Sequence, residues 1–150
     1  RLLEQAKRNQ VRSKLVPGRI FYCRNMVLGN PRRTVRDKYL VFIGAIEYKH
    51  RVLVINTEPA PYIQNNPHLM DDQVPIDCAS HDCLTHNSVV GCHELEEVDQ
   101  RDVENALVKE IDDIKGMISD NVRAEIVRVV SDSVNLMPLF QKFITIALKP

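Results

Sequence analysis

Four cations stand within seven residues of this chain and give it its clearest capacity for chemistry. They are Arg32, Arg33, Arg36 and Lys38. Guanidinium and ammonium groups bind phosphate, and a cluster of them releases counterions when it contacts a nucleic-acid backbone. The segment carries no interleaved aromatic residues that could stack on bases. It is therefore a candidate nucleic-acid contact, and a solvated polar loop is the alternative interpretation.

The charge is polarised along the chain. The 150 residues have no net formal charge, but residues 1–51 hold 13 of the 20 Lys and Arg residues and only three acidic residues, a net charge of +10. Residues 52–150 carry the compensating −10. Such a split indicates a basic face that attracts phosphates, or two halves that neutralise each other across a fold or dimer contact.

A second group has the atoms that bind zinc. Its members are Cys78, His81, Cys83 and Cys92. The spacing lacks the usual C-x2-C or H-x3-H pairs, and alternate strand residues point to opposite faces of a sheet. Structural zinc is therefore a minor alternative, and we expect no metal and no cofactor. Four irregularly spaced cysteines do not make a secreted disulfide framework, so reduced thiols are expected.

Five apolar runs with strand character must position these groups. The runs cover 18–24, 38–47, 51–57, 73–79 and 87–95. The short connections at 47–50 and 80–87 leave room only for hairpins, and no helix separates the runs, so the strands should be antiparallel neighbours in one strongly bent sheet. The sequence predicts a mainly β fold of the α+β class, a small barrel with flanking helices. The cations would lie in the loop between the first two strands, which Gly29, Asn30 and Pro31 mark.

Apolar residues at helical spacing predict the other elements. A helix over 1–14 should end before Pro17 and Gly18. Asp99 could cap a helix that runs to Lys115, and Ser119 could cap another. Pro138 then separates a last amphipathic segment. Residues 58–73, with three prolines, should form a long loop.

The composition fits a single domain over 1–150, with 44% hydrophobic and 27% charged residues. No apolar run approaches the roughly 18 residues of a membrane span, and the first residues lack the apolar stretch of a signal peptide. We therefore expect a cytoplasmic protein without membrane contact. The expected parts are an N-terminal helical extension (1–16), a β-barrel (17–98) and a helical part (99–150).

The order of these elements and several motifs resemble the MazF, PemK and Kid family of toxin endoribonucleases, whose fold is shared with the CcdB toxins. The resemblance covers roughly residues 17–135. Its best motif is Ser-Val-Val-Gly-Cys-His-Glu-Leu-Glu-Glu-Val-Asp at 88–99, which is similar to the family's Gly-Val-Val-Arg-Cys-Asp-Gln and the following turn to Ile-Asp. Shorter similarities stand at 17–22, 39–43, 54–57 and 116–119. The resemblance implies a bent antiparallel Src-homology-3-like barrel of the PemK/CcdB type plus C-terminal helices.

The resemblance also implies a function: a metal-independent endoribonuclease that cleaves single-stranded RNA. It implies a homodimer, with an antitoxin or another protein as a partner. The family's cation before the second strand falls on Lys38, and its phosphate-positioning Thr falls on Thr57. The fifth strand of the closest branch offers an Arg and an Asp to the reaction, and here Gly91 and His93 hold those places.

Metal-free RNA cleavage needs a base for the 2′-hydroxyl, cations around the phosphorane and an acid for the departing oxygen. His93 is the first candidate acid or base and His86 the second, because imidazole titrates near neutrality. Lys38 with Arg36 would hold the phosphate charge, and Thr57 would orient a non-bridging oxygen. Each of these residues also has an ordinary structural role open to it. Gly91 removes a phosphate-stabilising charge, so a catalytically lapsed module that binds nucleic acid or a protein is the rival interpretation.

Overall fold

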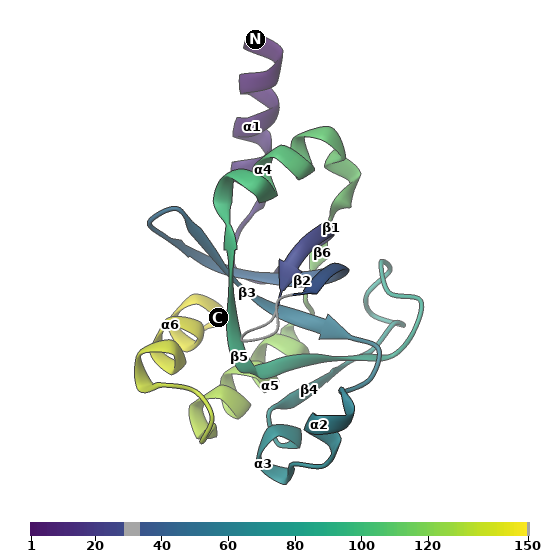
Figure 1. Ribbon diagram of the computed structural model, residues 1–150, viewed down its shortest axis with the longest axis vertical. Coiled ribbons are helices and arrows are strands. Elements are labelled where there is room, and N and C mark those ends of the chain that lie inside the picture. The colour runs from purple at the N-terminus through teal and green to yellow at the C-terminus, as the bar shows by residue number, and fades with distance from the viewer. Residues whose placement is uncertain (29–33, 150) are drawn as a thin grey trace.

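A six-stranded antiparallel sheet, curled into a half-barrel, forms the centre of the molecule (Figure 1). The computed structural model describes residues 1–28 and 34–149, with side chains for 1–25 and 36–149. The strands are β1 (Arg19–Leu28), β2 (Thr34–Ile46), β3 (Lys49–Asn56), β4 (Gln73–Ile76), β5 (Ser88–Asp99) and β6 (Ile114–Met117). Their order in the sheet is β4-β5-β3-β2-β1-β6. The expected antiparallel, bent sheet is confirmed, and β6 is an additional strand.

Helices cover both faces of this sheet. They are α1 (Leu2–Lys14), α2 (Pro61–Gln64), α3 (Pro67–Met70), α4 (Gln100–Lys109), α5 (Asp120–Asp132) and α6 (Pro138–Leu148), with a 3-10 turn at Ile111–Asp113. α1 and α4 pack on one face, and α5 and α6 pack on the other (Figure 1). Among the described residues, no helix has the length and apolar character needed to cross a bilayer.

The helix expected from Asp99 to Lys115 is wrong in its second half. α4 ends at Lys109, and the chain then turns into β6, whose Ile114 pairs with Phe21 of β1. Ile111 and Ile114 fit the spacing of a helix, but Ile111 lies in the 3-10 turn and Ile114 in β6. From there both side chains pack against the apolar core under α1 and α4. The edge of β1 offers backbone hydrogen bonds that a longer helix would leave unused.

The connection expected to be one long loop over 58–73 is also wrong in detail. It contains the one-turn helices α2 and α3, and each begins with a proline at its first turn. Proline suits that position because its fixed φ is helical and its missing N–H is not needed there. The Asn66 side chain accepts hydrogen bonds from the His68 and Leu69 amides and so caps α3.

The basic segment expected in a loop belongs partly to a strand. β2 begins at Thr34, and Arg36 pairs with Met26 of β1. A bulge at Arg24 and Asn25 accommodates this long hairpin, with Asn25 at φ 56° and its amide bonded to Asp37 Oδ1 at 2.7 Å. Arg36 is therefore a strand residue. Arg32 and Arg33 lie outside the described residues.

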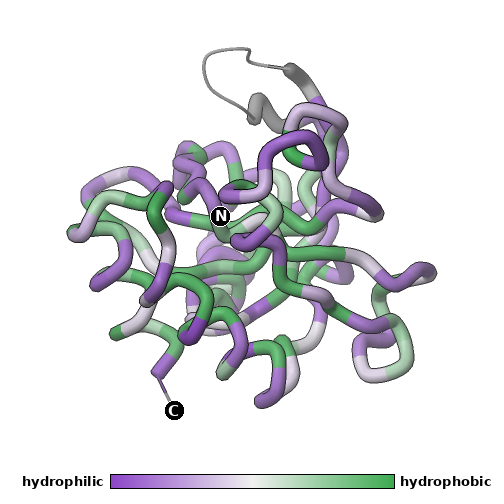
Figure 2. The backbone as a smooth tube through the Cα atoms, turned by 90° about the horizontal axis from the view of Figure 1, so that it is seen from below, coloured by the Kyte–Doolittle hydropathy of each residue, from purple (hydrophilic) through white to green (hydrophobic). Residues whose placement is uncertain are grey.

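Two apolar cores lie on the two faces of the sheet. The core under α5 and α6 includes Val41, Ile43, Leu53, Val90, Ile126 and Ile144. The core under α1 and α4 includes Val11, Phe21, Leu40, Val52, Val103 and Leu107. In Figure 2 much of the tube that runs through the middle of the molecule has the apolar colour, and many of the outer turns have the polar colour. Alternate residues of β2 and β3 thus enter different cores, as the two-residue period of a strand requires.

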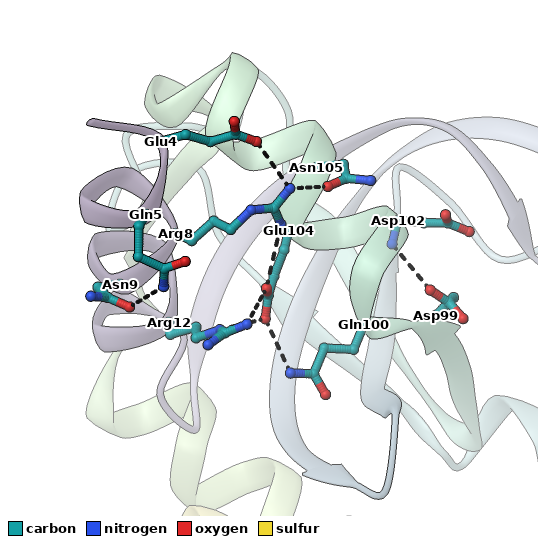
Figure 3. A network of polar contacts seen from close by, with 10 residues as sticks. All are labelled: Glu4, Gln5, Arg8, Asn9, Arg12, Asp99, Gln100, Asp102, Glu104 and Asn105. Atoms are coloured by element: carbon teal, nitrogen blue, oxygen red, sulfur yellow. Dashed lines mark hydrogen bonds and ion pairs between the residues drawn. The ribbon is translucent and has the colours of Figure 1, made fainter. Parts of the chain in front are cut away.

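A buried carboxylate fastens α1 to α4 (Figure 3). Glu104 is 3% exposed and accepts two hydrogen bonds of 3.0 Å from Arg12 and one of 3.1 Å from Gln100. Arg8 stands 3.7 Å away and also donates to Asn105. Burial disfavours the charged form of Glu104 and would raise its pKa. This effect is outweighed by the hydrogen bonds from Arg12 and Gln100 and by the charge of Arg12, so the pKa of Glu104 is lowered. The N-terminal helix is thus held chiefly by polar contacts.

Candidate functional site

Lys38 is engaged with a neighbouring strand. Its Nζ donates a 2.7 Å hydrogen bond to Asn56 Oδ1 at the end of β3. The side chain is half-buried, and burial together with the nearby Arg36 charge lowers the pKa of the ammonium. Lys38 shares its face of the sheet with Leu40, which enters the core under α1 and α4. The cation is thus positioned on the sheet and is not a free surface charge.

Thr57 and His86 lie on exposed parts of the chain. Thr57 follows the last residue of β3, and His86 belongs to the connection between β4 and β5. The His86 carbonyl accepts a hydrogen bond from Ser88 Oγ at 2.9 Å, which shapes the start of β5. Both side chains are exposed to solvent.

His93 has a fixed tautomer. Its Nδ1 lies 3.0 Å from Gln73 Nε2, and the same amide nitrogen is 3.1 Å from the Leu69 carbonyl. An amide N–H donates, so Nδ1 accepts and the neutral ring carries its hydrogen on Nε2. Burial lowers the pKa of His93, although the Asp72 charge opposes this. At neutral pH the ring is therefore uncharged and offers an N–H donor.

Gly91 makes room for this ring. A Cβ at Gly91 would stand 3.2 Å from His93 Cε1, 3.4 Å from Nδ1 and 3.6 Å from Gln73 Oε1. The ring therefore lies directly over the position where the resembled family has an arginine. Any side chain at this position competes with the present placement of His93.

We expect Gly91→Ala to displace His93. The ring must give by a few tenths of an ångström, which weakens its bond to Gln73 and exposes it to water. Because burial is what lowers the pKa of His93, that pKa should rise toward its ordinary value. Titration of the ring proton by NMR measures the change. Gly116→Ala is the control, because a Cβ there meets nothing within 4 Å. An identical His93 titration in both variants would contradict the contact.

A groove of about 1060 Å³ follows the second half of β5. β5 supplies the stretch from His93 to Asp99, α4 supplies Asp102, Asn105 and Lys109, and the α5–α6 connection supplies Asn135 to Met137. Of the four residues proposed for RNA cleavage, all described, only His93 lines it. The structure therefore brings one predicted residue to the groove and leaves Lys38, Thr57 and His86 elsewhere.

Carboxylates dominate the groove. Its acidic residues are Glu94, Glu96, Glu97, Asp99 and Asp102, and the basic residues among the described lining are Arg24, Lys49 and Lys109. Burial and the charge of Glu96 raise the pKa of Glu94. Two acids have basic neighbours: Glu97 with Arg51 at 3.1 Å and Asp99 with Lys49 at 3.8 Å. The motif at 88–99 contains Glu94, Glu96, Glu97 and Asp99, but the sequence analysis took none of these acids as a site residue.

The zinc alternative gains no support. Among the described residues no group of three or more His, Cys, Asp or Glu residues is arranged to hold a metal ion. Both His81 nitrogens are used, Nδ1 at 2.7 Å from the Asp77 carbonyl and Nε2 at 3.0 Å from the Ser119 amide. Cys92 is fully buried, which raises the pKa of its thiol. His81 thus connects the β4–β5 loop to the start of α5.

No protein-family model and no curated protein matches this chain. The resemblance to the MazF and PemK toxins therefore stays a prediction that depends on the order of short motifs. The site must be interpreted from its own geometry and charge.

Proposed function

We propose that this protein is a binding module, a catalytically lapsed Src-homology-3-like barrel of the PemK/CcdB type that holds a protein partner. The observation that carries the proposal is the acid-rich groove along β5, which is large enough to hold a ligand. Of the four residues proposed for RNA cleavage, all described, only His93 lines this groove. Carboxylates repel the phosphate backbone of RNA, whereas a protein can present cations to them.

The state of His93 agrees with binding better than with catalysis. A general base at Nε2 needs a free lone pair there, but the bond from Gln73 leaves that nitrogen protonated. A general acid is most effective when its pKa is near the working pH, and burial moves the pKa of His93 downward. The Nε2–H is suited to donate a hydrogen bond to a bound acceptor.

One observation favours an endoribonuclease as the second candidate. Lys38 contacts Asn56, which shares one face of β3 with Val54. Val54 pairs with Gly91 of β5, and the His93 ring lies over Gly91. Lys38 and His93 are therefore on the same face of the sheet, two strand spacings apart across it and also offset along the strands, so that more than about 10 Å separates them. An RNA backbone that spans this distance could meet both.

A pool of single-stranded RNA separates the two candidates. We expect the purified chain to leave every RNA intact, with or without added metal. If RNA binds, replacing Arg32, Arg33 and Arg36 together should weaken binding and flatten its salt dependence, because fewer counterions are released. The control replaces three exposed cations elsewhere: Lys7, Arg101 and Lys142. Cleavage that His93→Ala slows by about 100-fold or more would overturn the binding module and establish the nuclease.

We also propose a homodimer. The outer face of α6 and the segment before it leave large apolar side chains exposed: Val134, Met137, Leu139 and Ile146. Exposed apolar residues grouped in this way are typical of a surface that pairs across a two-fold axis.

A further inference from the structure

His81 is a buried histidine whose two ring nitrogens have opposite roles. The residue is 3% exposed. Its Nδ1 lies 2.7 Å from the Asp77 carbonyl oxygen, which can only accept, so Nδ1 carries a hydrogen. Its Nε2 lies 3.0 Å from the Ser119 amide, which can only donate, so Nε2 keeps its lone pair. The folded arrangement therefore requires the neutral ring in a single tautomer.

This ring fastens the β4–β5 loop, residues 77–87, to the start of α5. Ser119 is the N-cap of α5, and its hydroxyl accepts a hydrogen bond from the Val122 amide. The amide of an N-cap residue has no partner within its own helix, and here His81 supplies one. Among the described residues, every other hydrogen bond of the β4–β5 loop stays within the loop or joins it to Ser88. The bond between His81 and Ser119 is thus the polar attachment of this loop to the helix.

A proton on Nε2 would remove this attachment. An imidazolium donates from both nitrogens, so its Nε2–H and the Ser119 N–H would face each other as two donors. The Ser119 amide is part of the backbone at the start of a helix and cannot turn away to offer an acceptor. The positive charge would also stand at the N-terminus of α5, where the helix dipole disfavours cations. The charged ring is therefore incompatible with the closed loop.

The titratable groups of the surrounding elements do not offset this conflict. They are Asp77, Cys78, Asp82, Cys83 and His86 on the loop, Lys115 in β6, and Asp120 and Arg123 at the start of α5. Among the described residues, only Asp77 forms an ion pair with the ring, at 3.8 Å from Nδ1, and its side chain is 49% exposed. Water weakens a half-exposed pair of this length, so it cannot replace the hydrogen bond to Ser119.

His93 does not face the same conflict. Its Nδ1 also accepts, but from the side-chain amide of Gln73, whose Oε1 is buried without a hydrogen-bond partner among the described residues. Rotation of this amide would turn Oε1 toward a protonated Nδ1, at the expense of the bond to the Leu69 carbonyl. His81 faces a backbone donor and has no such adjustment.

We propose that His81 is a pH-sensitive latch: the neutral ring holds the β4–β5 loop against the start of α5, and protonation releases the loop. Leu84 of this loop is 7% exposed and belongs to the core under α5 and α6, so release would uncover apolar surface there. The ordinary pKa of a histidine in water is about 6.5. Because only the open loop takes up the proton, opening becomes more favourable as the pH falls below about 6.5.

Hydrogen exchange of the Ser119 amide tests the latch in the full chain. We expect its protection, relative to that of the Ile126 amide in the middle of α5, to fall about tenfold between about pH 7 and pH 5. His81→Gln is the matched variant, because its side-chain oxygen can accept from Ser119 but takes up no proton in this range. In that variant the relative protection should stay constant. A constant value in the natural chain as well, or an equal fall in both chains, overturns the latch.

Two measurements on the natural chain make the test independent of how the variant folds. NMR of the His81 ring nitrogens at neutral pH should find the hydrogen on Nδ1 and none on Nε2. Limited proteolysis should cut the β4–β5 loop faster at about pH 5 than at about pH 7, when each rate is divided by that for a free peptide of residues 77–87. A hydrogen on Nε2 at neutral pH, or a rate ratio that does not change with pH, overturns the latch.

Discussion

Glu104→Ala should release α1 and lower the free energy of unfolding by about 2–3 kcal/mol, since several charge-assisted hydrogen bonds lose their common acceptor. Arg12 and Gln100 bond to this carboxylate, and Arg8 stands 3.7 Å from it. α1 buries only Val11 within its own bounds, so apolar contacts cannot replace them. Urea denaturation measures the stability, and limited proteolysis reports the release of α1.

The matched control is Glu110→Ala. Glu110 is exposed at the end of the same helix, so its removal should change stability by no more than about 0.5 kcal/mol. Equal effects of the two substitutions, or a protease-resistant α1 in Glu104→Ala, would show that Glu104 does not fasten the helix.

The same carboxylate predicts a response to acid. The pKa of Glu104 is lowered in the folded protein from the ordinary value of 4.5. Its contribution to the free energy of unfolding is therefore complete above pH 4.5 and is lost as the pH falls from there through the lowered pKa. The increased protease sensitivity of α1 in acid should thus occur below pH 4.5 in the natural protein. In Glu104→Gln the sensitivity should be pH-independent over that range.

The sheet could be predicted from the sequence because its strands carry their own signals. Leu40, Val41 and Phe42 in β2, and Val52 and Leu53 in β3, form unbroken apolar runs that suit a strand buried on both faces. β6 could not be predicted in the same way. Its Ile114 fits the helical spacing that begins at Val103, and only the free edge of β1, which pairs Ile114 with Phe21, decides for a strand. Long-range pairing prevailed there over local periodicity.

The candidate site was predictable only in part, for a similar reason. The sequence singled out His93 and Gly91, and the structure places the His93 ring against Gly91. The groove itself depends on the interruption of pairing between Gly91 and Glu96 and on the shortness of β4, which ends at Ile76. Neither feature has a local sequence signal. The acids from Glu94 to Asp99 therefore became a lining only after the register of β5 was known.

Two isoleucines on α6 provide the last and largest expected contrast. Ile144 is fully buried in the core under α5 and α6, whereas Ile146 is 73% exposed. Both substitutions to alanine change helix propensity equally, so the difference between them reports burial alone. Ile144→Ala should lower the free energy of unfolding by about 2–5 kcal/mol through lost transfer energy and the cavity left behind. Urea denaturation of both variants measures it.

Ile146→Ala should cost no more than about 0.5 kcal/mol in a monomer. In the proposed homodimer, Ile146 lies in an apolar surface with Leu139, and Ile146→Lys would place a charge in that contact. Light scattering at micromolar concentration should then give a dimeric mass for the natural chain and a monomeric mass for Ile146→Lys. A monomeric natural chain contradicts the dimer, and a dimeric Ile146→Lys removes this face of α6 from its interface. Either result leaves the contrast with Ile144 intact, because that contrast depends on packing within one chain.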